Sequence, residues 1–387
     1  MGYSERRKLV RVTTVPISLR VLLKGQLRFM SRSFDIVAVS SSGPDLIAVG
    51  REQAVRTVGI EMTRKITPIR DLISLGRMFF FLRKERPHIV HSHTPKAGTV
   101  SMLAGWVARV PHRVHTVAGL PLTEATGLKR WLLIEIEKVT LSCATNVLVN
   151  STQLSEFMIK TGLCDTSKLK VLGHGSSNGI DTDFFFATSE LRAKAKTIRQ
   201  SLGIPAESLM FCFVGRMVAD KGLDELISAF VSISKECSAY LLLVGPFEED
   251  LDPLTSESRR LILNHEKIVH VGFQSDIRPY LTASTVLVHP SYREGFPNVV
   301  MQAGSMGLPC IVSNINGCNE IVMDGHNGII VEPKDTVGLE NAMRLMVKDD
   351  GLRQRLASSA REMIVSRYDQ REFWESLLQF YQKLMVD

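Results

Sequence analysis

The chain has 387 residues, 44% of them hydrophobic and 22% charged, which is typical of a globular protein and argues against disordered, collagen-like and coiled-coil classes. At roughly 150 residues per domain, this length predicts two or three domains. The net charge of +7 reflects an excess of Lys and Arg in the first half of the chain, which indicates an anionic partner: a membrane surface, nucleic acid or a phosphorylated substrate.

Apolar runs alternate with amphipathic segments along the first half. The strands expected there span residues 9–14, 34–40, 88–91, 113–117, 146–150 and 170–172. The expected helices span residues 22–31, 67–86, 96–109, 128–141 and 153–160. Strands that alternate with helices in this way predict βαβ units around a parallel sheet covered on both faces.

The alternation resumes after a polar stretch at residues 176–199. Strands are expected at residues 211–214, 240–244, 268–271, 285–289 and 310–313. Helices are expected at residues 223–237, 256–264, 277–283, 298–306, 336–348, 352–367 and 370–385. The sequence therefore predicts an α/β protein with two parallel-sheet units, and a substrate cleft beyond the carboxyl ends of the strands.

Several features of the sequence favour a cytoplasmic protein without metal or nucleic acid. No run of about 18 uncharged apolar residues is present, so no transmembrane helix is expected. Residues 1–8 are charged, unlike a signal peptide. The six cysteines are scattered, with no Cys-x-x-Cys pair and no histidine at zinc spacing, as expected of reduced thiols. No helix-turn-helix, zinc-finger or RNA-binding signature occurs.

The segment 292–309 holds the densest group of candidate residues. Gly295 permits a turn, and Pro297 suits the first position of a helix whose free amides would attract an anion. Glu294, just before this helix, can accept hydrogen bonds from sugar hydroxyls, and Gln302, further along it, could reach a second hydroxyl pair. The alternative is that Glu294 is a surface turn residue before an ordinary helix.

The segment 214–222 is a second candidate, between a strand and a helix. Gly215 allows a sharp turn, and Arg216 and Lys221 stand on either side of it. Arginine can bind two phosphate oxygens at once and lysine acts as a mobile charge, so this pair suits a diphosphate held without metal. The alternative is a solvated basic turn.

Together these segments resemble the retaining nucleotide-sugar glycosyltransferases of family four, which have the GT-B fold of two facing Rossmann-like domains. The family signature begins G-R-x-x-x-x-K-G, matched by Gly215-Arg216 and Lys221-Gly222, and ends in E-G-[FL]-P-x-x-x-x-E-A-x-A-x-G-x-P. The remaining matches are Val271-Gly272-Phe273, Glu294-Gly295-Phe296-Pro297, Ala303, Gly307 and Pro309. The resemblance runs from about Leu9 to the final helix. It implies an acceptor-binding domain at residues 1–187, onto which the last helix, 368–387, packs back, and a nucleotide-sugar-binding domain at residues 188–367.

The resemblance also implies roles for individual residues of the second half. Arg216 and Lys221 would bind the donor diphosphate and stabilise the departing nucleotide, and Glu294 would bind the transferred sugar. Val271 and Phe273 would lie at the base pocket. The other donor-binding residues would be Gly215, Gly295, Phe296, Pro297, Asn298, Val299 and Gln302. Gln302 departs from the signature, which has a ribose-binding glutamate there. Asn319 and Glu320 would contact phosphates or the acceptor.

In the first half, the strand at 88–91 delivers two histidines to its carboxyl end. Because side chains alternate along a strand, His91 and His93 lie on the same face. By the resemblance, His93 would lie near the reacting sugar, Lys96 would neutralise an acceptor phosphate, and Gly25 would belong to a loop that approaches the donor phosphates. The alternatives are a hydrogen-bonded structural histidine and a lysine that faces solvent.

The function implied is transfer of a hexose or N-acetylhexosamine from a nucleoside diphosphate sugar, with UDP favoured, and no cofactor. The acceptor would be a polyprenyl-diphosphate-linked or other saccharide in capsule, O-antigen or exopolysaccharide synthesis. Two alternatives are a UDP-sugar 2-epimerase, which shares the two-domain fold, and an inactive basic scaffold at a membrane. Incubation with UDP-N-acetylglucosamine alone tests for the epimerase, which would form an epimer without acceptor. Calorimetry with UDP tests for the scaffold, which would give no heat.

Residues 77–86 combine apolar and basic side chains, and Arg6, Arg7, Lys8 and Arg11 add positive charge. Each Lys or Arg near an anionic bilayer contributes about 1 kcal/mol, so the sequence predicts peripheral contact with the inner face of the plasma membrane. The alternative is that Met78, Phe79 and Leu82 belong to the core, with the arginines on the solvent side.

Overall fold

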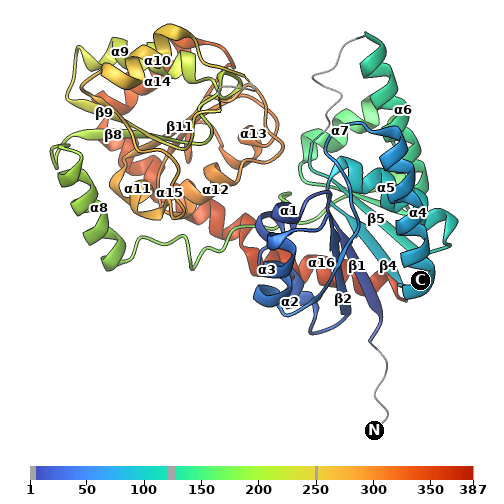
Figure 1. The fold of residues 1–387 in the computed structure, drawn as a ribbon. Coiled ribbons are helices and arrows are strands. Elements are labelled where there is room, and N and C mark those ends of the chain that lie inside the picture. Colours follow the sequence, from blue (N-terminus) through green and yellow to red (C-terminus); the bar gives the residue numbers. More distant parts are fainter. Residues whose placement is uncertain (1–5, 120–126, 249–251, 387) are drawn as a thin grey trace. The chain divides into compact units, whose positions relative to one another are not determined.

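A computed structural model describes residues 6–119, 127–248 and 252–386. The chain forms two compact units: residues 1–179 together with 371–387, and residues 180–370 (Figure 1). Residues 180–187 belong to the second unit, because Ile180 pairs with Asp369 and the Arg361 guanidinium donates to the carbonyls of Thr182 and Phe185. The first boundary therefore lies at residue 179, where the sequence suggested 187.

The first unit is built on a seven-stranded parallel sheet of order β3-β2-β1-β4-β5-β6-β7. Its strands are β1 (Lys8–Val12), β2 (Asp35–Ser40), β3 (Arg56–Gly59), β4 (Ile89–Ser92), β5 (His112–Val117), β6 (Asn146–Val149) and β7 (Leu169–Val171). Its helices are α1 (Pro16–Leu22), α2 (Gln26–Met30), α3 (Pro44–Gln53), α4 (Pro68–Glu85), α5 (Pro95–Val107), α6 (Gly127–Cys143), α7 (Thr152–Lys160) and α16 (Gln370–Leu384).

The central strands of this sheet are apolar because helices cover both faces. On one face, Val10 and Val90 pack with Met78 and Leu82 of α4. On the other, Leu9 packs with Leu377, Phe380 and Tyr381 of α16, and this helix runs beside β1 and β2 in Figure 1. The end of the chain thus completes the core of the first unit.

The second unit is built on a six-stranded parallel sheet of order β10-β9-β8-β11-β12-β13. Its strands are β8 (Leu209–Val214), β9 (Ala239–Val244), β10 (Ile268–His270), β11 (Val286–His289), β12 (Cys310–Ser313) and β13 (Gly328–Val331). Its helices are α8 (Ser189–Ser201), α9 (Leu223–Ser234), α10 (Ser256–Asn264), α11 (Arg278–Ala283), α12 (Asn298–Ser305), α13 (Cys318–Ile321), α14 (Thr336–Lys348) and α15 (Asp350–Tyr368). The predicted fold class, α/β with two Rossmann-like parallel-sheet units, is confirmed.

Each sheet has one point at which the strand order reverses. The first sheet grows from β1 through β2 to β3 and then resumes on the other side of β1 with β4, and the second does the same at β8 and β11. Loops that leave neighbouring strands there run to opposite faces, which opens a crevice at the carboxyl ends of the strands where ligands bind in such sheets.

The structure differs from the expected elements in several places. The sequence did not predict α1, α3, α8, α13, β3 or β13, and the helix expected at 22–31 is the shorter α2, which begins after Gly25. Arg11 is completely buried, so the prediction that it adds charge to the surface is wrong. Among the described helices, none combines the length and apolar character needed to cross a bilayer. Part of the charged segment 1–8 lies outside the described residues.

Candidate functional site

The turn after β8 carries two of the candidate cations. Gly222 has φ +69°, and a Cβ there would lie 2.1 Å from the carbonyl oxygen of Pro290, so only glycine lets this turn lie so close to the end of β11. Lys221 precedes that glycine at the end of a single 3-10 turn, Ala219–Lys221. The close approach of the two backbones therefore brings Lys221 next to the loop after β11.

Glu294 lies in that loop, and two residues hold its carboxylate. Lys221 Nζ donates to Glu294 Oε1 at 2.5 Å, and His289 Nε2, at the end of β11, donates to the same oxygen at 2.9 Å. The side chains of Lys221 and Glu294 are each 16% exposed. Burial raises the pKa of Glu294, but the hydrogen bond and charge of His289 and Lys221 lower it to about 2, so the carboxylate is ionised at neutral pH.

Arg216 lies on the other side of the same turn. Its Nη1 donates to Glu248 Oε2 at 2.8 Å, and this hydrogen bond, despite partial burial, raises the pKa of the guanidinium. The charges of Asp220 and Glu294 also raise that pKa. Arg216 and Lys221 are thus brought together beside Glu294 at the β8–β11 switch point, as the sequence predicted for a diphosphate site.

The loop from Glu294 leads directly into α12. Pro297 is the N-cap residue, with φ −74° and ψ 108°. Before it, the Gly295 carbonyl accepts from Asn316 Nδ2 at 3.0 Å, and a Cβ on Gly317 would lie 2.6 Å from that same carbonyl. The N-terminus of α12, and with it the positive end of the helix dipole, is therefore fixed beside Glu294.

The other predicted donor residues lie around this centre. Asn298, Val299 and Gln302 belong to α12, and Gly215 follows β8, where its N–H donates to the Val244 carbonyl. Phe296 packs against Tyr368, with ring centroids 5.5 Å apart. Val271 follows β10 and is half-buried, and the Phe273 side chain is 74% exposed.

The two predicted acceptor-side residues of this unit belong to α13, which follows Gly317. Asn319 Nδ2 donates to Asn314 Oδ1 at 2.9 Å, and the Glu320 carbonyl accepts from the Tyr368 hydroxyl at 2.9 Å. Both residues thus follow directly on the turn, at Asn316 and Gly317, that contacts the Gly295 carbonyl.

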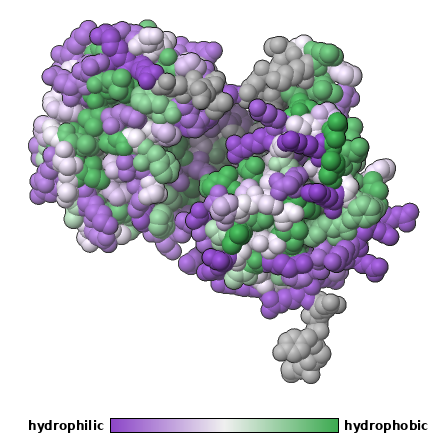
Figure 2. Space-filling model, in the orientation of Figure 1, coloured by the Kyte–Doolittle hydropathy of each residue, from purple (hydrophilic) through white to green (hydrophobic). Residues whose placement is uncertain are grey.

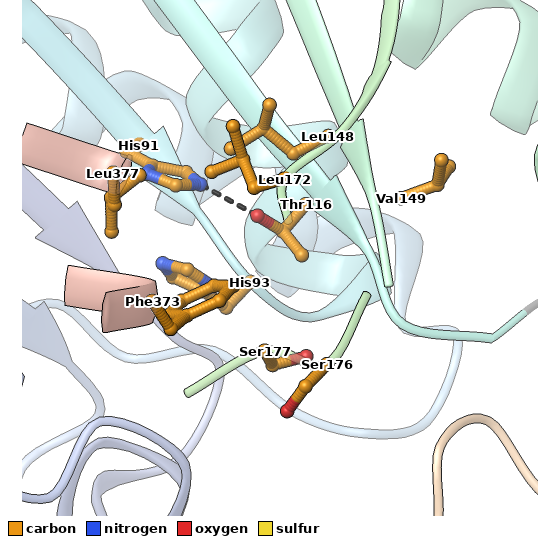
Figure 3. Close-up of a pocket in the computed structure, with 10 residues that line it drawn as sticks. All are labelled: His91, His93, Thr116, Leu148, Val149, Leu172, Ser176, Ser177, Phe373 and Leu377. Carbon is orange, nitrogen blue, oxygen red and sulfur yellow. Dashed lines mark hydrogen bonds between the residues drawn. The ribbon is translucent and has the colours of Figure 1, made fainter. Parts of the chain in front are cut away.

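In the first unit, His93 follows β4 at the β1–β4 switch point. Arg11 of β1 donates to His93 Nε2 from Nε at 3.2 Å and from Nη2 at 2.6 Å, and Nη2 also donates to Gln26 Oε1. His91 Nε2 lies 2.7 Å from Thr116 Oγ1, and its Nδ1 lies 2.5 Å from the Tyr381 hydroxyl. Figure 3 shows the two imidazoles in the wall of a small cavity that Phe373 and Leu377 of α16 close.

The histidines of this cluster are neutral. Burial and then the charge of Arg11 hold the pKa of His93 well below its ordinary value, and burial does the same for His91. Burial lowers the pKa of His115 to about 4. The first-unit site is therefore a buried set of neutral imidazoles around one cation, unlike the ionised second-unit site.

Two further predicted residues of the first unit have partners within it. Lys96 Nζ donates to Asp71 Oδ2, so its charge is paired with α4. Gly25 has φ +79°, and a Cβ there would lie 2.6 Å from the Trp374 ring, so this glycine makes room for α16. Neither position projects a free functional group into the His93 cluster.

The sequence did not single out His289 and Arg11, which contact the candidates Glu294 and His93, or Gln26, which accepts from Arg11. The first had a usable signal, because a histidine at the end of a buried strand five residues before Glu294 points to the same loop. Arginine within the apolar strand 8–12 was a second signal, since a buried charge needs a specific reason. Gln26 carried none, because nothing in the local sequence shows that it bonds Arg11 of another element and Asn178, 152 residues away.

Comparison with known proteins agrees with this arrangement. Residues 10–175 match the glycosyl transferase 4-like domain, and residues 194–363 match glycosyl transferases group 1. The chain is 31% identical over 386 residues to the capsular polysaccharide biosynthesis glycosyltransferase CapM of Staphylococcus aureus, with 99% of each chain covered. The chain belongs to the group 1 glycosyltransferases.

Other relatives of this glycosyltransferase fit the same family. It is 28% identical to the UDP-Gal:alpha-D-GlcNAc-diphosphoundecaprenol alpha-1,3-galactosyltransferase of Escherichia coli, with 93% of this chain and 94% of that one covered. The crystal structure of Anabaena HepE in complex with UDP superposes with a TM-score of 0.81 at 18% identity, covering 97% of this chain and 100% of that chain. The GT-B fold that the sequence resemblance implied is thereby confirmed.

The pKa of Glu294 leads to a prediction about stability. Its folded pKa, about 2, lies below the ordinary value of 4.5, so its ionised contacts stabilise the protein fully above about pH 4.5 and are lost as the pH falls toward 2. At pH 7 we expect Glu294→Gln to lower the free energy of unfolding by roughly 1–3 kcal/mol, and the melting temperature with it. The difference from the wild type should shrink below pH 4.5.

Calorimetric melting of both proteins at several pH values measures this difference. Glu257→Gln is the control, because the Glu257–Arg260 pair on α10 has both side chains 63% exposed and contributes little at any pH. A Glu294→Gln difference that does not change with pH would contradict the assigned ionisation.

Proposed function

We propose that this glycosyltransferase is a retaining, metal-independent enzyme that uses a nucleoside diphosphate sugar, with UDP as the nucleotide. It transfers a hexose or N-acetylhexosamine to a lipid-linked saccharide in the synthesis of a surface polysaccharide. The observation that carries the proposal is the group of Arg216, Lys221 and Glu294 at the β8–β11 switch point. Two cations and a helix N-terminus suit a diphosphate, and a carboxylate beside them suits sugar hydroxyls.

The proposed reaction needs no protein base. The bond from the anomeric carbon to the diphosphate oxygen breaks, and the acceptor hydroxyl oxygen bonds to that carbon on the same face. The hydroxyl proton passes to the departing diphosphate. Arg216 and Lys221 neutralise the negative charge that develops on the leaving group, which in this proposal takes the place of a metal ion. Arg216 would exchange Glu248 for the diphosphate, and Glu294 would accept from the sugar while it keeps His289.

Relatives support the acceptor class. The Escherichia coli relative is named for a diphosphoundecaprenol-linked acceptor, and so is an N-acetylgalactosaminyltransferase of Campylobacter jejuni that is 26% identical over 79% of this chain and 81% of that one. We extend this acceptor class to the present chain as a proposal. Gln302 in place of a ribose-binding glutamate would weaken donor affinity, since hydrogen bonds to charged groups contribute about 1.5–3 kcal/mol and neutral ones about 1.

Removal of either cation tests the diphosphate assignment. We expect Arg216→Ala and Lys221→Ala each to reduce transfer at least about 100-fold, because a donor that stabilises the charge of a transition state contributes about 3–4 kcal/mol. UDP binding measured by calorimetry should weaken in parallel. Arg260→Ala is the matched control, since the Arg260 guanidinium pairs with Glu257 on α10, where both side chains are 63% exposed. Full turnover by either site variant would overturn the assignment.

The same preparation separates the two alternatives. A 2-epimerase would convert UDP-N-acetylglucosamine without any acceptor, and an inactive scaffold would give no heat with UDP. We expect no epimer, and we expect heat from UDP binding.

We also propose that α4 contacts an anionic membrane surface. Met78 and Leu82 are buried, as the core alternative held, but the opposite side of the helix is apolar as well. Ile69, Ile73 and Phe80 are 79%, 52% and 71% exposed, and their spacing places them on one side of the helix. Apolar and charged residues lie side by side on the surface of this unit in Figure 2.

Basic side chains border this apolar stripe. Arg70 and Arg77 lie two helical turns apart and line a cavity of about 280 Å³ together with Glu61, Thr63, Ile73 and Ser74. Lys8 does not add to this group of positive charges, because its Nζ forms an ion pair with Glu85. Exposed apolar residues flanked by arginines on one helix suit the interface of an anionic bilayer.

Binding to vesicles tests the membrane proposal. We expect the protein to bind vesicles that contain phosphatidylglycerol and to bind pure phosphatidylcholine weakly. Arg70→Ala and Arg77→Ala should each weaken binding about fivefold, which corresponds to about 1 kcal/mol. Leu263→Ser is the control, because Leu263 is also an exposed apolar residue, at 62%, but belongs to α10 of the second unit. Equal binding by all variants would contradict the assignment of α4.

A further inference from the structure

Arg11 is an unusual residue for the centre of a sheet, because it is a cation with no exposed surface. A guanidinium does not lose its proton in proteins. Its hydrogen-bond partners are two neutral groups, His93 Nε2 and Gln26 Oε1, and its Nη1 atom has no partner within the described part of the chain. No carboxylate among the described residues forms an ion pair with it. A buried charge without a counter-charge is costly, so its position calls for an explanation in function.

The contact with His93 determines where that ring carries its proton. Both Arg11 nitrogens that reach His93 Nε2 are donors, at 3.2 Å and 2.6 Å, so Nε2 must be the acceptor with a free lone pair. A neutral imidazole has one N–H, and it is therefore on Nδ1. Protonation of Nε2 would place a second positive charge against the guanidinium.

The other groups that face His93 act in the same direction. His91 lies beside it on β4, with ring centroids 4.2 Å apart, and His115 lies on β5. Tyr381, from α16, lies near His91, and the Arg11 guanidinium carbon lies over the Tyr381 ring, 6.0 Å from the ring centroid. None of these groups supplies a negative charge at neutral pH, since burial raises the pKa of Tyr381 to about 12. Among the described residues, none of those around His93 would thus stabilise an imidazolium.

We propose that Arg11 is the positioning residue for His93: it fixes the imidazole as the neutral tautomer protonated at Nδ1, so that His93 can donate a hydrogen bond to substrate and cannot act as a base. This inference deepens the proposed function, and the role that it gives His93 in transfer rests on that proposed function. It gives a reason for the buried cation, and it agrees with a reaction in which the diphosphate takes the acceptor proton.

A relay of side chains holds Arg11 in place. Gln26 accepts from Arg11, and its Nε2 donates to Asn178 Oδ1 at 2.8 Å. The same Asn178 oxygen accepts from Trp374 Nε1 at 2.7 Å. Asn178 lies just before the residue at which the chain leaves the first unit, and Trp374 just after it returns. The orientation of Arg11 is therefore fixed by first-unit residues from the two stretches of chain that flank the second unit.

Nitrogen-15 NMR of the histidines in the full chain tests the proposal, because the two ring nitrogens shift differently in each tautomer. The signal of His93 is assigned by its loss in His93→Gln. In the wild type we expect one neutral form, protonated at Nδ1, from pH 8 down to pH 5. In Arg11→Met the removal of a positive charge should raise the pKa of His93 by about one unit or more and allow both tautomers.

Gln26→Glu provides a second variant if Arg11→Met does not fold. It keeps the guanidinium and gives it a carboxylate partner, so the pKa of His93 should rise while the Nδ1 tautomer persists. Arg113→Met is the control, since Arg113 is a half-buried arginine of the same sheet that contacts the carbonyls of Val110 and Cys143. In Arg113→Met, the nitrogen-15 shifts and the pKa of His93 should match those of the wild type.

A wild-type His93 protonated at Nε2, or a His93 signal unchanged in both Arg11→Met and Gln26→Glu, would overturn the proposal. These spectra do not depend on enzyme activity, so they stand even if the proposed transfer is wrong. Measurement of activity is a separate test. In Arg11→Met the acidic side of the pH–rate profile of transfer should move to higher pH by about one pH unit, together with the pKa of His93. A rate that falls equally at every pH would show that Arg11 supports only the structure.

Discussion

The Glu294 carboxylate, held between Lys221 and His289, is the interaction on which the second unit's site depends. It joins the turn after β8 to the loop after β11, and it stays ionised because a cation and a hydrogen-bond donor outweigh the cost of burial. Gly222 makes this possible, since any side chain there would push the two loops apart. A fixed charge pattern at a sheet switch point is what a charged, hydroxyl-rich ligand needs.

The two units use the same architecture for opposite electrostatics. Each places its candidate residues where the strand order reverses, β1–β4 in one sheet and β8–β11 in the other. In the second unit charges are paired and partly exposed, so an anionic ligand can exchange with an existing partner. In the first unit a buried cation lies among neutral imidazoles, so proton positions are fixed in advance. The second unit would stabilise charge and the first would donate hydrogen bonds. This division fits the proposed reaction, in which the leaving group carries the charge.

Much of this could be predicted from the sequence, because the information was local. Alternating strands and helices specify parallel sheets, and the motifs around Arg216 and Glu294 lie in turns whose glycines and proline fix the backbone. Other features depend on distant packing. Arg11 belongs to the core because α16, more than 350 residues later, covers its strand and supplies Tyr381. Short elements such as α3 and β3 were missed, since few residues carry their periodicity. Met78 is buried and Phe80 is exposed on the same helix, and this difference likewise depends on which side of α4 faces the sheet.

A crystal structure of the protein with an unreactive UDP-sugar analogue tests the central claim most directly. The account predicts the diphosphate within hydrogen-bonding distance of both Arg216 and Lys221, with a sugar hydroxyl on Glu294 and the Arg216–Glu248 contact broken. A nucleotide bound elsewhere, with Arg216 still on Glu248 and Lys221 distant from phosphate, would contradict it.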